Sequence, residues 1–397
     1  MASRIAWLDA SDADQRRMRE ILMLFAEQDS RDELGIGSLR DSIADGLFPG
    51  TSTLLTRARY LMFVPWCFQY ASSQSDQLES VERVERRLIS GLRDSQDFAG
   101  LMGARSGESL KTLPSAVYWA ALRHYNIVRP GCETRWDAAR WKSVAIVGDD
   151  DDATRKETAF SATLPDPPAG FPDHVPDGFT LTNAEAGWLR DRILERSRGT
   201  LLAHLITCPP SRTSKTPWND ESALGADENI TRLLDHARNF SIVMQGAAFV
   251  YNLLLAEEYE LGNNTRVIEP VARYRAELEA WSDEARAHRV DAWNIMAFWQ
   301  WYAGTNTTYL LHRTRDFVSQ WFEIVSSDGF TGLADNPRAR SLIRQRERAH
   351  KGAQARIGNR KRIQQWQGSA GAGRLVYRWP QVRAIVLDIH DGLERNA

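Results

Sequence analysis

The sequence is poor in cysteine and lacks the common cofactor motifs, and these absences exclude several classes of protein. Cys67, Cys132 and Cys208 are odd in number and far apart, which argues against a disulfide framework or a zinc site and fits a reducing cytoplasm. The chain has no P-loop, no dinucleotide-binding glycine fingerprint, no HExxH run and no Gly-x-Ser-x-Gly elbow. We therefore expect no ATP hydrolysis, no dinucleotide redox chemistry, no zinc chemistry and no cofactor.

Long hydrophobic runs are missing as well. The N-terminus becomes polar too early for a signal peptide. The longest apolar run, residues 241–256, is shorter than a membrane span and contains Gln245 and Asn252. We interpret this run as a buried helix and expect a cytoplasmic protein without a membrane partner.

The composition is that of a globular protein, with 43% hydrophobic and 26% charged residues in 397. Helical periodicity dominates the chain, and we predict a mainly α fold (α+β with minor strand content) in which LVYRW, residues 375–379, forms a strand. Helices are expected at 11–27, 77–93, 114–125, 182–197, 229–261, 271–290 and 292–302, and another closes the chain at 380–393. Pro114 marks the start of one of them, and a capping box formed by Thr182 and Glu185 marks the start of another.

Shifts in composition predict four regions. Residues 1–147 form an N-terminal helical region that contains a candidate active-site hairpin at 31–70, and 148–180 form an acidic, proline-rich connector. Phe160, Phe171 and Phe179 predict that this connector wraps over the surface, because a free linker gains nothing from regularly placed aromatics. Residues 181–335 form an aromatic-rich helical core region, and 336–397 form a basic DNA-binding segment.

The hairpin 31–70 gathers glycine, hydroxyl, charged and aromatic residues around helix signals. Gly35 and Gly37 allow a turn, and Ser38 is a candidate cap for a short helix at 39–45 that ends at Gly46. Thr51 or Ser52 is expected to cap the following helix, which Pro65 kinks or stops.

This hairpin supplies the candidate catalytic residues. Asp41 and Asp45 are four apart on one helix face, and either is a candidate for a carboxylate that acts as a general base or stabilises a cationic transition state. Arg57 and Arg59 are candidates for holding a phosphate or the substrate. Structural ion pairs between such residues are an equal alternative.

Three aromatic residues of the hairpin could contact a substrate. Tyr60, Phe63 and Trp66 are candidates for stacking on an extruded base, with packing on a helix face as the alternative. His124, beside an aromatic row, is interpreted as a packing residue rather than a catalytic base.

Charge is strongly uneven along the chain. Residues 338–378 contain twelve Lys or Arg against one acid, Glu347, so this segment carries +11 and the remainder about −13 within a total of −2. We predict one basic helix beginning at Asn336 that binds a phosphate backbone, and the glycine-rich run 368–373 could bring backbone amides to a phosphate. The DNA-binding candidates are Arg40, Arg344, Arg348, Arg356, Arg360 and Lys361; the alternative is a helix that packs against the acidic remainder.

Several runs together resemble a bacterial family without an assigned function. They are RDELGIGSLRD, LFPGTSTLLTRARYLMFVPW, PSAVYW, LTNAEAGWLRDRI and LVYRWPQVRAIVLDIHDGL. Members look like anti-phage defence components, and the resemblance extends to a DNA glycosylase that acts on phage genomes carrying glucosylated hydroxymethylcytosine. The resemblance implies that the protein flips a modified cytosine out of phage DNA and excises it, leaving an abasic site. For this reaction we rank Asp41 first, Asp45 second and Asp32 third as the catalytic carboxylate. Two alternatives are a non-catalytic DNA-binding subunit of a defence system and a metal-dependent nuclease.

Overall fold

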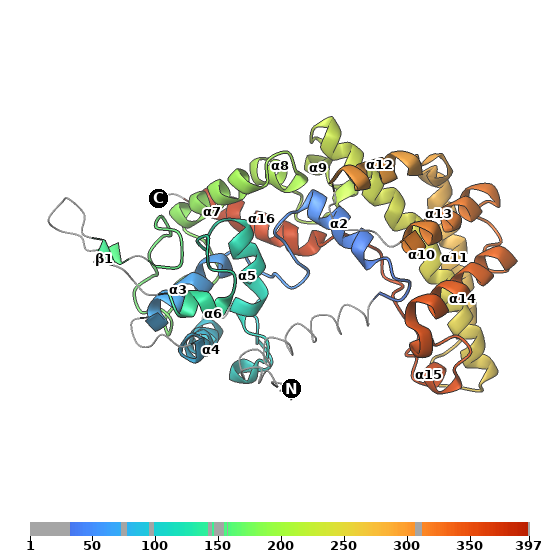
Figure 1. The fold of residues 1–397 in the computed structure, drawn as a ribbon, viewed down its shortest axis with the longest axis horizontal. Coiled ribbons are helices and arrows are strands. Elements are labelled where there is room, and N and C mark those ends of the chain that lie inside the picture. Colours follow the sequence, from blue (N-terminus) through green and yellow to red (C-terminus); the bar gives the residue numbers. More distant parts are fainter. Residues whose placement is uncertain are drawn as a thin grey trace, which may run out of the picture. The chain divides into compact units, whose positions relative to one another are not determined.

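The computed structural model describes residues 32–72, 78–94, 99–141, 145–146, 155–156, 158–305 and 312–395. This described part is mainly α, as predicted (Figure 1), and its one sheet pairs β1 (Ala145–Ile146) antiparallel with β2 (Arg155–Lys156). The predicted helix at 11–27 and the aspartate run at 149–152 lie outside the described residues.

Most of the predicted helices are present. They correspond to α4 (Leu78–Asp94), α5 (Pro114–His124), α7 (Asn183–Arg196), α10 (Glu228–Leu261), α11 (Pro270–Ala287), α12 (Ile295–Thr305) and α16 (Trp379–Leu393). The capping box that begins α7 is formed as its sequence predicts: Glu185 N donates to Thr182 Oγ1 at 3.2 Å, and Thr182 N donates to Glu185 Oε2 at 2.9 Å.

Two predictions in the basic segment are wrong. Residues 375–378 form no strand, because Tyr377 and Arg378 have φ of 50° and 66°, which no strand accommodates. The basic helix is interrupted: α14 (Pro337–Lys351) ends at Gly352, whose φ is 53°, and a separate short helix, α15 (Arg360–Gln364), follows Gly358, whose φ is 79°. Gly352 and Gly358 thus divide the cations of the basic segment between two helices, α14 and α15.

The chain folds into two compact units. Unit 1 comprises Met1–Ser42 and His236–Leu375, and unit 2 comprises Ile43–Asp235 and Val376–Ala397. The chain passes from one unit to the other inside α2 (Gly37–Leu47), inside α10 and after Leu375. This division differs from the predicted boundaries at 147, 180 and 335, since composition changes along the chain do not record which segments pack together.

Unit 1 is built around the apolar part of α10. Trp281 of α11 and Trp321 of α13 (His312–Ser327) donate indole N–H bonds to the carbonyls of Ile242 and Val243, at 2.7 and 2.8 Å. Gly246 permits this close packing, because a Cβ there would lie 2.5 Å from the Trp281 ring. α10 is long and apolar enough to cross a membrane, but 89% of its most apolar window is buried inside the protein, which confirms the predicted buried helix.

Unit 2 contains two groups of packed helices (Figure 1). α3 (Tyr60–Ser72) packs on α4, α5 and α6 (Arg135–Ala139), while α16 packs on α7 and α8 (Leu201–Thr207). The remaining short elements are η1 (Gly107–Ser109), η2 (Pro217–Asn219), α9 (Glu221–Leu224), η3 (Val290–Ala292) and η4 (Gly352–Gln354), of which the last two belong to unit 1.

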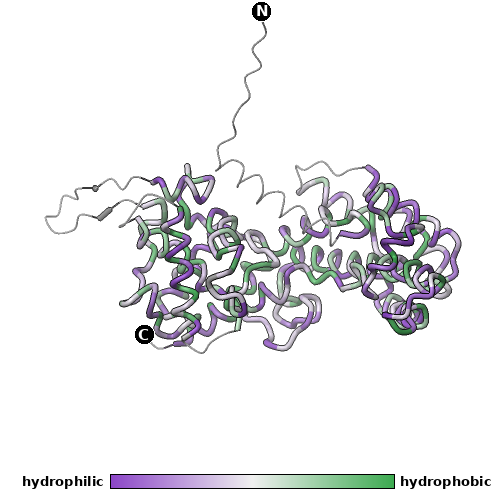
Figure 2. Tube along the Cα trace, turned by 90° about the horizontal axis from the view of Figure 1, so that it is seen from below, coloured by the Kyte–Doolittle hydropathy of each residue, from purple (hydrophilic) through white to green (hydrophobic). Residues whose placement is uncertain are grey.

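The described part of the connector wraps over unit 2, as predicted. The side chains of Phe160, Phe171 and Phe179 are buried, and Phe160 pairs with Val128 through an isolated antiparallel bridge. Within each unit the helices alternate hydrophobic and hydrophilic residues (Figure 2), the pattern expected when one face of each helix lies against a core.

Candidate functional site

The candidate hairpin begins with a helix cap made by Asp32. Its Oδ1 accepts a bond from Ile36 N at 2.8 Å and its Oδ2 one from Gly37 N at 2.6 Å, at the first turn of α2. Ser38, the predicted cap, lies inside the helix, which ends at Leu47. Gly35 takes the predicted left-handed turn, with φ of 67°. The Asp32 carboxylate is therefore occupied by the α2 amides, and its role here is structural.

Asp41 and Asp45 lie one turn apart on α2 but have different partners. Asp41 forms two bonds with Arg40, from Nε at 2.9 Å and from Nη2 at 3.2 Å. Asp45 Oδ1 accepts a 2.6 Å bond from Arg378 Nη1, and the Asp45 side chain is 63% exposed. Asp41 is thus held by its neighbour in unit 1, whereas Asp45 remains accessible in unit 2.

The next helix, α3, begins at Tyr60, later than predicted. Thr51 and Ser52 do not cap it: Thr51 Oγ1 donates to Phe48 O at 2.7 Å, and Ser52 Oγ accepts from Leu54 N at 3.3 Å. Arg57 and Arg59 therefore precede the helix. Pro65 lies inside α3 without ending it.

Arg57 and Arg59 form structural ion pairs, which is the alternative to substrate binding. Arg57 Nε lies 3.0 Å from Asp388 Oδ2 on α16, and Arg59 Nη2 lies 2.9 Å from Glu185 Oε1 on α7. Arg59, 2% exposed, also donates to the carbonyls of Pro176 and Gly178. The structure corrects the assignment of both arginines to the substrate. Their guanidinium groups join segments of unit 2 through ion pairs.

The three aromatic candidates are in the core. Tyr60, Phe63 and Trp66 are each 0% exposed, Tyr60 Oη accepts from Met102 N at 3.0 Å, and Trp66 Nε1 donates to Pro165 O at 2.7 Å. Packing therefore accounts for these side chains, and none of them presents a face to a base. Because their rings are buried against other side chains of the core, they are not available to stack on a base.

Unit 2 contains a cavity of about 380 Å³ next to Asp45, which we call the Asp45 cavity. Its polar side comes from the turn after α2 and from the end of α5, and its apolar side from α5 and Leu55. The residues that matter for chemistry are Asp45, Gly50, Thr51, Ser52 and His124.

His124 brings an unsatisfied polar atom to this cavity. Its Nε2 is buried without a hydrogen-bond partner among the described residues. Burial, followed by the charge of Arg196, lowers the pKa of His124 below its usual range, against a smaller opposing effect of Asp45. The imidazole is therefore neutral at pH 7, and its free nitrogen can accept or donate a bond according to the tautomer.

The wall of the Asp45 cavity is a tightly held turn. Tyr125 Oη donates to Pro49 O at 2.9 Å, and Arg378 Nη1 donates to Thr51 O at 2.7 Å. Gly50, with φ of 77°, is required at this position, because a Cβ would lie 2.5 Å from His124 Cδ2. The turn thus places a glycine backbone against the histidine ring and keeps the cavity open.

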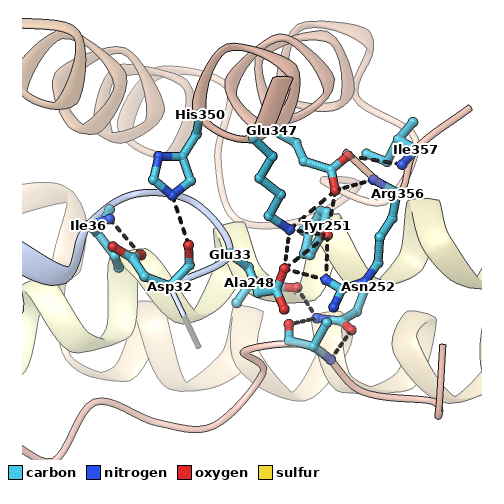
Figure 3. A network of polar contacts seen from close by, with 12 residues as sticks. Asp32, Glu33, Ile36, Ala248, Tyr251, Asn252, Glu347, His350, Arg356 and Ile357 are labelled. Carbon is cyan, nitrogen blue, oxygen red and sulfur yellow. Dashed lines mark hydrogen bonds and ion pairs between the residues drawn. The ribbon is translucent and has the colours of Figure 1, made fainter. Parts of the chain in front are cut away.

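A second polar centre lies in unit 1 (Figure 3). We call it the Tyr251 cluster. It consists of Glu33, Tyr251, Glu347 and Arg356, which Figure 3 labels, together with Lys351, which bonds to Tyr251 Oη at 2.9 Å. Tyr251 Oη lies 2.7 Å from Glu347 Oε1 and 3.3 Å from Glu33 Oε2, and Lys351 and Arg356 both form ion pairs with Glu33. Two carboxylates and two cations therefore share one tyrosine.

Every carboxylate of the Tyr251 cluster is satisfied. Glu347 is 0% exposed and accepts bonds from the backbone N–H groups of Arg356 and Ile357, at 2.8 and 3.0 Å. Burial alone would raise the pKa of Glu347, but these amides, Tyr251 and Lys351 hold that pKa below its usual range. Burial, and then the charges of Glu33 and Glu347, raise the pKa of Tyr251, so the phenol remains a neutral donor.

The glycine-rich run 368–373 is tied into unit 1. Asn252 Nδ2 donates to Ala370 O at 2.7 Å, and Ala370 N donates to Asn252 Oδ1 at 2.8 Å. Tyr274 Oη donates to Gly368 O at 2.8 Å. The amide of Ala370 is therefore occupied within the fold, which leaves less of this run for a phosphate than predicted.

The basic segment divides into paired and unpaired cations. Arg338, Arg340, Lys351, Arg356, Arg374 and Arg378 form ion pairs with carboxylates, and Arg346 donates to three backbone carbonyls. Arg344, Arg348, Arg360 and Lys361 are exposed, and none of the four has an ion pair with a described residue. Pairing with carboxylates thus accounts for six of the twelve cations of this segment, and the predicted role of the four exposed cations in DNA binding stays a prediction.

Two of the six residues predicted to bind DNA form ion pairs within the fold instead. Arg356 pairs with Glu33 in the Tyr251 cluster, and Arg40 pairs with Asp41. Their charges are neutralised inside unit 1, since a buried or half-buried arginine needs a carboxylate partner.

Sequence reasoning missed Glu33, Tyr251 and Asp388 and the ion pair of Glu185 with Arg59, and it interpreted His124 as packing. No local pattern marks these contacts, because the residues that form them lie more than 70 positions apart in the chain. Among the described residues, no group of three His, Cys, Asp or Glu side chains is placed to hold a metal ion. The nuclease alternative therefore has no ligand set in the part of the chain that the structure describes.

The fold and this site define a mainly α globular protein with an acid- and histidine-lined cavity. The chain belongs to a family of unknown function, DUF6361, whose model matches residues 2–391. No curated protein matches the chain. No solved structure matches it either.

Proposed function

We propose that this protein is a cytoplasmic anti-phage DNA glycosylase that excises a flipped, glucosylated hydroxymethylcytosine and leaves an abasic site. The observation that carries the proposal is the Asp45 cavity. It has an accessible carboxylate, an unsatisfied histidine nitrogen and about 380 Å³ of space. Sites for small ligands commonly measure roughly 300–1,000 Å³, so a nucleobase with a sugar attached is within its range.

Asp45 is the residue we assign to bond chemistry. Its Oδ1 is held by Arg378, and its Oδ2 has no hydrogen-bond partner among the described residues. Hydrolysis breaks the bond between C1′ and the base nitrogen while a water oxygen bonds to C1′. A carboxylate stabilises the cationic sugar of that transition state and takes a proton from the water, and the leaving base takes a proton in turn.

His124 and the two hydroxyl residues are assigned to recognition. His124 lines the cavity, and its Nε2 is buried without a partner among the described residues. A base or a sugar hydroxyl that reaches this nitrogen would give it a hydrogen bond. Thr51 and Ser52 line the same cavity and add polar groups of the kind that bind sugar hydroxyls. A substrate that satisfies Nε2 removes a buried unpaired atom, which favours binding.

The unpaired cations of unit 1 support nucleic acid as the substrate. Arg344 and Arg348 lie four residues apart on α14, with Arg360 and Lys361 on α15, and all four are exposed. Exposed cations without carboxylate partners neutralise phosphates and release counterions.

An assay for abasic sites tests the proposal. Purified protein is incubated with glucosylated phage DNA and with unmodified DNA, without ATP and with a chelator, and alkali-labile sites are counted. We expect such sites in the modified DNA only. Intact modified DNA would refute the glycosylase, and strand scission that the chelator abolishes would favour the nuclease.

A non-catalytic DNA-binding subunit is the second candidate, and the four unpaired cations favour it to the same degree. It predicts salt-dependent binding without abasic sites. Phage protection that persists in Asp45→Asn would support this candidate against the glycosylase.

A further inference from the structure

The turn between α10 and α11 exposes two large aliphatic side chains. Leu261, the last residue of α10, and Ile268, two residues before α11, are each 83% exposed, more than any other large hydrophobic residue that the structure describes. Single exposed aliphatic residues are ordinary, but here two flank one turn and the fold leaves both in solvent. We call Leu261, Ile268 and the turn between them the tip.

Hydrogen bonds to Tyr259 hold this turn against α10. Asn264 Nδ2 donates to Tyr259 O at 2.9 Å, and Val267 N donates to Tyr259 Oη at 3.2 Å. The side chain of Val267 points inward against Gly368, where a Cβ would lie 2.9 Å away. Val267 anchors the turn, while Ile268 beside it is left in solvent.

The segment that carries α15 lies directly against the same turn. Gly358 N donates to Glu258 Oε2 at 2.7 Å, and Arg266 Nη2 donates to Trp366 O at 3.0 Å. The rings of Tyr259 and Trp366 are 5.6 Å apart. These contacts place the start and the end of the α15 segment on the turn that ends in Leu261 and Ile268.

The charges around the tip favour a polyanion. Arg360 and Lys361 of α15 and Arg266 of the turn are exposed and have no ion pair with a described residue. Three acids face the same region: Glu258 is bonded to Gly358 N, Glu260 is bonded to Val271 N, and Glu269 is exposed. A backbone amide does not cancel the charge of a carboxylate, so these three acids offset the three cations. Arg273, bonded to Gly368 O, and Arg362 of α15 have no ion pair with a described residue either, and they leave this region with more positive than negative charge.

We propose that this tip is a DNA-contacting wedge, in which Leu261 and Ile268 insert at a base step while Arg266, Arg360 and Lys361 hold the flanking phosphates. Aliphatic side chains flanked by cations unstack base steps and kink a duplex by roughly 20–90°. The proposal deepens the glycosylase function and rests on it for the choice of DNA as partner. Local unstacking assists the extrusion of a base for excision.

The test uses the full chain and an unmodified 30-base-pair duplex labelled at both ends. Binding is measured by anisotropy at 50 and 200 mM salt, and bending by energy transfer between the labels. We expect wild type to bend the duplex and to lose affinity at least tenfold over this salt range. Leu261→Ser with Ile268→Ser should abolish bending while the salt dependence is retained, and Arg360→Ala with Lys361→Ala should lower the salt slope by about two.

Matched controls come from exposed positions of unit 2. Leu224→Ser, at a residue 54% exposed, controls for the loss of surface apolarity, and Arg105→Ala with Lys111→Ala controls for the loss of two exposed charges. Tip variants that behave like these controls would overturn the wedge. Binding to vesicles of anionic lipid with no bending of DNA would also overturn it, in favour of a membrane surface.

The same variants are assayed for abasic sites in glucosylated phage DNA, which separates the two proposals. Unchanged abasic-site formation by both tip variants would refute the wedge and leave the glycosylase standing. Bending that depends on the tip, without any abasic sites from wild type, would refute the glycosylase and leave the wedge standing.

Discussion

The Tyr251 cluster and the Asp45 cavity both bring carboxylates and cations together, but they differ in what they leave unsatisfied. In the cluster, Glu347 accepts four bonds within unit 1 and has no exposed surface. In the cavity, Asp45 is 63% exposed and His124 Nε2 has no partner among the described residues.

This difference teaches how to separate structural charge from chemical charge. A saturated, buried cluster resists any added ligand, because a ligand would have to replace bonds that already exist. A cavity with an unsatisfied buried atom gains a bond when it is filled. The four predictions below challenge this distinction, from the largest expected effect to the smallest.

Asp45→Asn should lower the rate of abasic-site formation by about 10²–10⁴-fold, the range in which a general base contributes. Its melting temperature should change little, since an exposed ion pair contributes only about 0–1 kcal/mol. Single-turnover kinetics on glucosylated DNA measures the rate. Asp41→Asn should retain activity, because Arg40 already holds that carboxylate; the reverse ranking would return the chemistry to Asp41.

Glu347→Ala should lower the free energy of unfolding by about 2–6 kcal/mol, because it removes the acceptor of the backbone amides of Arg356 and Ile357, and each buried donor left without a partner costs about 1–3 kcal/mol. Urea denaturation measures the change. Glu323→Ala is the matched control in unit 1, since Glu323 pairs with Arg338 at the surface and should contribute less than about 1 kcal/mol. Equal effects of the two variants would mean that the cluster is not a stabilising centre.

Glu85 gives unit 2 a pH-dependent stability. Burial raises its pKa to about 7, although Ser115 N and Oγ donate to its carboxylate at 2.6 and 2.8 Å. The folded protein therefore holds this proton more tightly than the unfolded chain. The stabilisation is complete below about pH 4.5 and is lost as pH rises to about 7, at a cost of roughly 3 kcal/mol.

Glu85→Gln should remove this dependence, because the amide can keep both bonds to Ser115 without ionising. At pH 8 the variant should be more stable than wild type by about the same amount, measured by urea denaturation between pH 5 and pH 8. A parallel decline of both proteins with pH would contradict the assignment to Glu85.

Arg344→Ala with Arg348→Ala should have the smallest effect. Each phosphate contact that is lost should lower the salt slope of DNA binding by about one, with no change in stability. Anisotropy with an unmodified duplex at several salt concentrations measures the slope. Arg338→Ala, which removes a cation already paired with Glu323 and Asp328, should leave the slope unchanged. Equal slopes for all three proteins would exclude α14 from the DNA surface.

Local signals predicted the elements well and their partners poorly. The capping box at Thr182 and the proline at the start of α5 were read correctly, because the groups that satisfy a helix end lie within a few residues of it. Arg57 and Arg59 were assigned to a substrate, because Asp388 and Glu185 are distant in sequence. The ion pair between Arg356 and Glu33 was missed for the same reason, because the two residues are far apart in the sequence.

The sequence by itself determined the mainly α fold, the buried apolar helix α10 and the concentration of positive charge at 338–378. These properties follow from periodicity and composition, which act over short distances along the chain. Only the tertiary structure decided which of the distant charges are cancelled: it paired Arg356, Arg57 and Arg59 with carboxylates and placed Asp45 and His124 in the lining of one cavity. The reason is that burial and pairing depend on neighbours in space, and long-range packing alone brings those neighbours together.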